Sequence, residues 1–142
     1  MPETEPTVAP DTWEYLLHIP SDLRAVTLCR RTVRLILTLH GLIRLVDTAE
    51  LLAAELVANA VLHTKGPAAL GVRRTPRGTV WIGAWDTDPL PPSTPRALGP
   101  VEEMEAGRGL GLVRAYADRW GWHPTGRFGA DGKYVWCELA AA

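Results

Sequence analysis

The sequence predicts an α+β fold of two layers, in which helices cover one face of a mostly antiparallel, mixed sheet. The order of the expected elements leads to this prediction, because a strand is followed by two helices, a hairpin, a long loop, a third helix and a second hairpin. Hairpins place their strands antiparallel, whereas a parallel sheet needs strands and helices in regular alternation. The length of 142 residues fits a single domain.

The first part of the chain should contribute one strand and one helix. Residues 1–11 mix Pro, Glu and Thr with almost nothing to bury, so we expect a disordered tail ahead of a single domain at 12–142. Residues 13–19 have the composition of a strand. Ser21 is expected to N-cap a helix that runs through about His40.

A second helix carries the most informative pattern of the chain. Asp47 and Glu50 resemble a capping box at its start, and Gly66-Pro67 ends it. Residues 50–63 are apolar on nearly every face, and an apolar helix belongs inside a domain. Unpaired polar groups are costly there, so its polar stripe must meet polar groups of the protein or a polar ligand. The stripe follows the spacing i, i+4, i+8 and consists of Glu55, Asn59 and His63.

The middle of the chain predicts a hairpin and then a long loop. Strands at 68–75 and 79–86 flank Pro76-Arg77-Gly78, which is a turn signal. Residues 87–106 contain five prolines and no regular period, which is typical of a functional lid or a disordered insertion. A second hairpin is predicted near the end of the chain, with strands near 121–125 and at 133–140.

Gly107, Gly109 and Gly111 stand at alternate positions before a helical pattern that continues to about Trp120. Glycines let the backbone approach a bulky anion, and a helix start offers unpaired N–H groups, so the segment could seat a phosphate. Glycines also serve turns and close helix packing, so the run alone is weak support. It follows a proline-rich loop and has no Gly-Lys-Ser/Thr, which excludes a Rossmann fingerprint and a P-loop.

Asp86 ends the second strand of the first hairpin, where two interpretations are open. Its carboxylate could accept a hydrogen bond from the exocyclic amine of a base and so disfavour a base with a carbonyl there. It could equally begin the turn Asp86-Thr87-Asp88-Pro89.

Four features of the chain, in this order, resemble the motifs of the GHKL (Bergerat-fold) ATPase/kinase superfamily. They are the Glu-x-x-x-Asn-Ala-x-x-His helix, the strand-ending Asp86, the loop and the Gly-x-Gly-Leu-Gly segment. These motifs are its N box, first glycine box, ATP lid and second glycine box. The chain looks most like the single-domain members, the anti-sigma-factor type serine/threonine kinases and their ATP-binding regulatory relatives, over roughly residues 13–140. It departs from the family at the first glycine box, usually Asp-x-Gly-x-Gly, which reads Asp86-Thr87-Asp88-Pro89-Leu90-Pro91.

The resemblance implies a role for each matching position. Asn59 would be the protein ligand of a Mg²⁺ ion that bridges the ATP phosphates, and Glu55 would be the general base. Asp86 would receive the adenine amino group. His63 would contact phosphate or metal, or be a helix-end histidine satisfied by a carbonyl. Backbone donors to the phosphates would come from the second glycine box, with added charge from the arginine: Gly107, Arg108, Gly109, Leu110 and Gly111.

The resemblance implies a kinase that phosphorylates an anti-anti-sigma (STAS-type) protein and sequesters a sigma factor. Two alternatives stay open: a regulatory module that binds ATP but transfers phosphate slowly or not at all, and an α+β scaffold whose stripe is an internal hydrogen-bond network. A homodimer is also open. The net charge of −1 argues against a nucleic-acid or membrane surface. Two cysteines without metal or redox spacing, and no signal peptide or membrane span, predict a cytoplasmic protein.

Overall fold

The structure is a computed structural model that describes residues 11–63, 66–90, 92, 108–127 and 129–141, without the side chains of residues 63 and 108–110. The predicted tail, apart from residue 11, lies outside this part of the chain. So do Gly107 and all of the predicted lid except residues 87–90 and 92.

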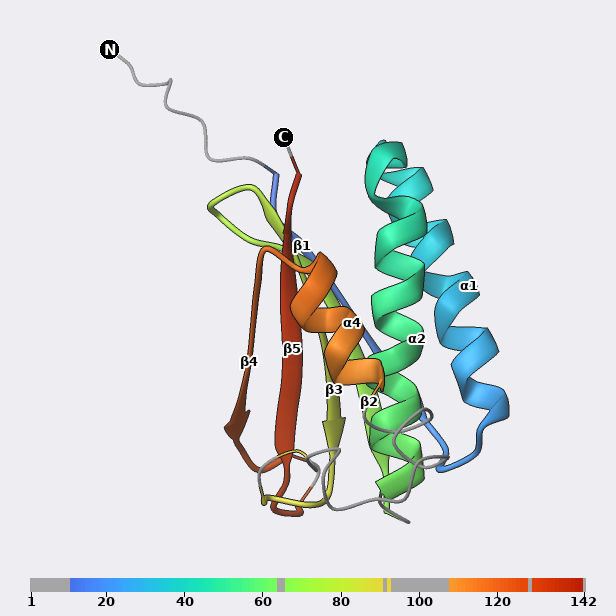
Figure 1. Ribbon diagram of the computed structural model, residues 1–142, viewed down its shortest axis with the longest axis vertical. Helices are drawn as coiled ribbons and strands as arrows, with labels where there is room; N and C mark the ends of the chain where they lie inside the picture. Colours follow the sequence, from blue (N-terminus) through green and yellow to red (C-terminus); the bar gives the residue numbers. More distant parts are fainter. Residues whose placement is uncertain (1–10, 64–65, 91, 93–107, 128, 142) are drawn as a thin grey trace.

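A five-stranded sheet and helices on one of its faces form two layers (Figure 1). The strand order is β1-β2-β3-β5-β4, and all four pairings are antiparallel. The predicted α+β class is therefore confirmed, but the described residues contain no parallel pairing, so the expected mixed sheet is corrected to an antiparallel one. The strands are β1 (Trp13–Ile19), β2 (Ala68–Arg74), β3 (Thr79–Asp86), β4 (Arg119–Pro124) and β5 (Lys133–Ala140).

Helix α1 (Arg24–Leu39) begins two residues later than the sequence predicts. Leu23 occupies the N-cap position and makes no side-chain cap, so the prediction of Ser21 as the N-cap residue is wrong. Asp22 instead accepts a hydrogen bond from the backbone N–H of Arg24 at 2.8 Å. It also pairs with the Arg24 guanidinium at 2.6 Å. This local turn of residues 20–24 delays the start of the helix.

Helix α2 (Val46–His63) follows a short 3₁₀ helix, η1 (Ile43–Leu45). The predicted capping box is wrong, because Asp47 lies inside the first turn of α2. Arg34 of α1 binds both acidic side chains, at 3.0 Å from Asp47 and 2.9 Å from Glu50. These carboxylates therefore join α1 to α2. No helix in the described ranges is long and apolar enough to cross a membrane.

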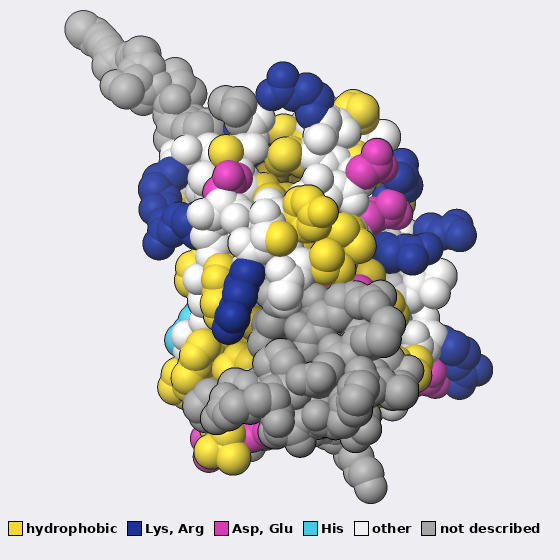
Figure 2. Space-filling view, viewed as in Figure 1, with side chains coloured by type: hydrophobic (Ala, Val, Ile, Leu, Met, Phe, Trp, Pro, Cys, Tyr) yellow, Lys and Arg dark blue, Asp and Glu magenta, His cyan; other side chains and the backbone are white. Residues whose placement is uncertain are grey.

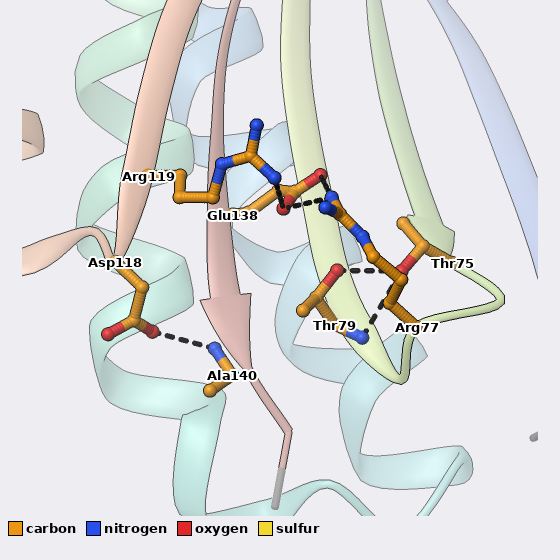
Figure 3. A network of polar contacts seen from close by, with 7 residues as sticks. All are labelled: Thr75, Arg77, Thr79, Asp118, Arg119, Glu138 and Ala140. Carbon is orange, nitrogen blue, oxygen red and sulfur yellow. Dashed lines mark hydrogen bonds and ion pairs between the residues drawn. The ribbon is translucent and has the colours of Figure 1, made fainter.

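Helix α4 (Arg108–Tyr116) ends four residues before the predicted end at Trp120, which lies in β4. The chain turns because Asp118 bonds to the end of β5 twice: its N–H donates to the carbonyl of Glu138 at 3.0 Å, and its carboxylate accepts from the N–H of Ala140 at 2.7 Å (Figure 3). The turn delivers the chain from the helical layer into the sheet.

Alternate residues of the strands face the helices and form the main core with α1, α2 and α4. The opposite sheet face carries a smaller aromatic cluster that contains Trp81, Trp85 and Tyr134. Trp81 lies across Gly83, where a Cβ atom would come within 2.3 Å of the ring. On the described part of the face in Figure 2, Lys and Arg side chains are scattered among Asp and Glu and form no single basic patch.

Candidate functional site

Three of the predicted motifs lie toward one end of the sheet. Helix α2 ends at His63 shortly before β2 begins at Ala68, and Ala69 pairs with Trp85 beside Asp86 at the end of β3. Helix α4 packs against α2, and in Figure 1 it starts beside the C-terminal half of α2. The α2 stripe, the strand-ending aspartate and the start of α4 are thus brought to the same region of the molecule.

The stripe on α2 contains an amide whose oxygen has no partner. Asn59 is 5% exposed, and its Oδ1 atom is buried without a hydrogen bond to any described residue. A buried acceptor left unpaired costs about 1–3 kcal/mol, so an orphan in a folded protein calls for an explanation. Glu55 lies one turn earlier on the same helix, as the predicted spacing requires. It is half-buried. His63 is the last residue of α2, and its side chain lies outside the described part of the chain.

The Asn59 oxygen fits a metal ion that brings most of its own ligands. Mg²⁺ takes hard oxygen ligands, keeps several waters, and commonly uses only one or two protein side chains together with substrate phosphates. The described residues contain no group of three or more His, Cys, Asp or Glu side chains that could hold a metal unaided. A metal at Asn59 would therefore need oxygens from a bound molecule, and phosphate oxygens meet that need.

The start of α4 offers backbone donors. Residues 108–111 form the first turn of the helix, so the glycine segment lies in the helix and not before it, as far as the structure describes it. The first N–H groups of a helix have no partner within the helix and carry its positive dipole end. Gly111 is exposed, and a Cβ atom there would meet no atom of the described residues within 4 Å. Packing against the described residues therefore gives no reason for glycine at this helical position, whereas the approach of an anion does.

Asp86 lies in a closed polar environment. The residue is 1% exposed, and the Lys133 Nζ atom is 3.0 Å from its Oδ1 atom and 3.2 Å from its Oδ2 atom. The backbone N–H of Asp88 also donates to Oδ1, at 2.9 Å. Burial raises the pKa of the Asp86 carboxyl, while the hydrogen bonds from Asp88 and Lys133 act in the opposite direction. The acceptor expected to face an adenine amino group is already engaged within the protein, and it also starts the predicted turn.

Sequence reasoning missed Lys133, which is 3% exposed and directly opposite Asp86 in the β3–β5 register. A signal for it was present. The predicted strands 79–86 and 133–140 have equal lengths, and an antiparallel pair without stagger places the last residue of one opposite the first residue of the other. The sequence-based prediction did not pair these two strands, which are distant in sequence, and so did not place Lys133 opposite Asp86.

A cavity of about 700 Å³ lies at the other end of the sheet. There Arg77 donates to both oxygens of Glu138, at 2.8 and 2.9 Å, and Arg119 lies 3.6 Å from the same carboxylate (Figure 3). The single Glu138 carboxylate thus lies between two guanidinium groups, and these contacts join the β2–β3 turn, β4 and β5. The cavity is lined by Thr12, Trp13, Glu14, Arg73, Arg74, Thr75, Pro76, Arg77 and Glu138, so it is separate from Asn59 and Asp86.

The comparisons with known proteins found a similar protein but do not show a family for this chain. No family model matches the chain. It is 39% identical over 75 residues to a protein of Streptomyces coelicolor that is described only as the uncharacterized protein SCO4941. The match covers 52% of this chain and 66% of that protein, so the chain spans slightly less than two thirds of its relative. The similarity carries no activity to this chain.

Proposed function

We propose that this chain is an ATP-binding regulatory protein of the anti-sigma-factor serine/threonine kinase type, with a Bergerat-type fold. It would transfer the γ-phosphate of Mg-ATP to a serine or threonine of a STAS-type partner. One observation carries the proposal: the buried Oδ1 atom of Asn59 has no partner among the described residues, on a helix that packs against α4, where no described atom lies within 4 Å of a Cβ placed at Gly111. A hard-oxygen ligand and unpaired N–H donors are what a magnesium triphosphate needs.

Each residue has a distinct task in this proposal. Asn59 holds the metal through Oδ1, and Mg²⁺, when bound, neutralises charge on the phosphate oxygens. The first N–H groups of α4, with Gly107, donate to the phosphates, and Arg108 adds positive charge. Glu55, on the same stripe as Asn59, accepts the proton of the attacking partner hydroxyl. His63 remains a candidate contact to phosphate.

Replacing Asn59 tests the central contact. Asn59→Leu keeps a similar shape and removes the unpaired oxygen, so stability should stay the same or rise by about 1 kcal/mol. Binding of Mg-ATP, measured by isothermal titration calorimetry, should be lost or at least about tenfold weaker, because one metal ligand is gone. Unchanged affinity would remove Asn59 from this role.

Thr75→Val is the matched control for that experiment. Thr75 is also a buried polar residue, but its hydroxyl is 2.7 Å from the Thr79 hydroxyl and accepts from the Thr79 N–H at 3.2 Å. The isosteric change should therefore cost about 1 kcal/mol of stability. ATP affinity should be unchanged, since Thr75 lies at the opposite end of β3 from Asp86.

Phosphate transfer is tested with γ-labelled ATP and candidate STAS proteins from the same genome. The parent chain should label a partner serine or threonine. Glu55→Gln should bind ATP with similar affinity and lose about 10²–10⁴-fold in transfer rate, the usual contribution of a general base. Equal transfer by the variant and the parent would reject Glu55 as the base.

A second candidate is a module that binds nucleotide without transferring phosphate. The observation that favours it is the environment of Asp86. Its carboxylate is held by Lys133, and the segment that it begins has Asp88 and Leu90 at the positions of the expected glycines, with prolines at 89 and 91. Proline fixes φ and stiffens the start of the segment. ATP binding that depends on Asn59, with no label on any partner, would select this candidate.

A further inference from the structure

Lys133 occupies the Asp86 carboxylate, which is the group expected to read a base. Its ammonium group has three hydrogens to donate. Three oxygen atoms lie within hydrogen-bond distance of Nζ: the two of Asp86 at 3.0 and 3.2 Å and the carbonyl of Asp88 at 2.9 Å. Every donor of Lys133 can therefore be used inside the protein.

The Asp86 carboxylate is equally committed. Oδ1 accepts from both Lys133 and the Asp88 N–H, and Oδ2 accepts from Lys133. Asp88 in turn accepts the N–H of Leu90 at 3.0 Å, so two successive turns fix the chain beyond β3. A base amine could reach the Asp86 carboxylate only by displacing a buried ammonium from its partners, and breaking a buried ion pair from one side is strongly unfavourable.

We propose that Lys133 determines how the site treats the base: by binding the Asp86 carboxylate, it prevents Asp86 from recognising the base. The site then takes purine nucleoside triphosphates through their phosphates and metal ion, and it does not distinguish adenine from guanine. This inference rests on the proposed function and departs from the role that the family resemblance gives to Asp86. Asp86→Asn should therefore leave the base preference as it is.

Competition between nucleotides tests the inference. ATP and GTP, each with Mg²⁺, are titrated against a ribose-labelled fluorescent ATP analogue bound to the full chain. The two affinities should agree within about threefold, whereas a buried carboxylate that reads the base would separate them by about 5- to 150-fold. A preference for ATP above about threefold overturns the inference and leaves the proposed function standing. No binding of either nucleotide overturns the proposed function, and the inference falls with it.

Variants identify the residue responsible. Lys133→Met keeps the length of the side chain and releases Asp86, so the preference for ATP over GTP should rise at least about fivefold. An unchanged ratio in folded Lys133→Met would show that Lys133 is not the determinant. Arg77→Met is the matched control, because it removes a cation from a carboxylate at the opposite end of the sheet, and its ratio should equal that of the parent. If Lys133→Met does not fold, the ratio of ATP affinity to GTP affinity in the parent chain still tests whether the site distinguishes adenine from guanine.

Discussion

Two buried polar residues of this chain differ in one respect that decides their roles. Thr75 has both hydrogen-bond partners within the β2–β3 turn, whereas the Asn59 oxygen has none among the described residues. Satisfied polar groups hold a fold together, and an unsatisfied one in a folded protein points to a bound water, ion or ligand. At the scale of the residue, we therefore expect the functional site where a buried polar group lacks the hydrogen bond that would stabilise the fold.

The two cysteines give a prediction at the same scale. Burial raises the pKa of Cys29 to about 11 and that of Cys137 to about 12. Only the thiolate is reactive, so at pH 8 both thiols should react with Ellman's reagent far more slowly in the native protein than in guanidinium chloride. Because the folded pKa values exceed the unfolded ones, the thiols also oppose folding as the pH rises above 9. Rapid native labelling would contradict the buried positions.

At the scale of the element, α1 and α2 are joined through Arg34. Its pairing lowers the pKa of Glu50. A carboxyl with a lowered folded pKa contributes stability above its ordinary pKa of 4.5 and loses that contribution as the pH falls below it. Arg34→Met should therefore lower the urea midpoint slightly at pH 7, and the difference from the parent should shrink as the pH falls below 4.5. A difference that does not shrink would assign the effect to packing.

Helix α4 carries a prediction that separates stability from binding. Gly111→Ala should stabilise the protein by about 0.5–1 kcal/mol, because glycine is a poor helix former and the added Cβ meets nothing. The same variant should weaken Mg-ATP binding if the phosphates approach this turn. Ala115→Gly, exposed later in α4, is the control, and it should lower stability without changing ATP affinity. Equal ATP affinity of Gly111→Ala and the parent would place the phosphates elsewhere.

At the scale of the whole molecule, the two ends of the sheet differ. The hairpin end is cross-linked by Arg77, Glu138 and Arg119 and by the bonds of Asp118 to the end of β5. The other end brings together Asn59, Asp86 and the start of α4. Hydrogen exchange should therefore show that Mg-ATP protects amides of residues 87–111 and leaves residues 75–79 unchanged. Protection confined to 75–79 would move the binding site to the large cavity.

Local signals predicted much of this fold. Strand 13–19 and the turn at 76–78 were recognised because their signals are local: residue composition, proline and glycine. The predicted Ser21 cap was wrong because the Asp22 carboxylate binds the backbone N–H at the start of α1. The predicted Asp47–Glu50 capping box was wrong because the acidic side chains bind Arg34 of α1 instead.

The candidate site was predictable only in part, for a related reason. The α2 stripe follows from helical periodicity, so its members could be read from the sequence. The pairing of Lys133 with Asp86 depends on a contact between strands 47 residues apart in sequence, which no local pattern reveals.

The most direct test is a crystal structure of the protein with Mg²⁺ and a non-hydrolysable ATP analogue. The account predicts a metal ion at about 2.0–2.1 Å from Asn59 Oδ1, with its other ligands from phosphates and water. It also predicts phosphate oxygens at the first N–H groups of α4. A metal ion bound away from Asn59, or an Asn59 oxygen that meets only water while the analogue is bound, would contradict it.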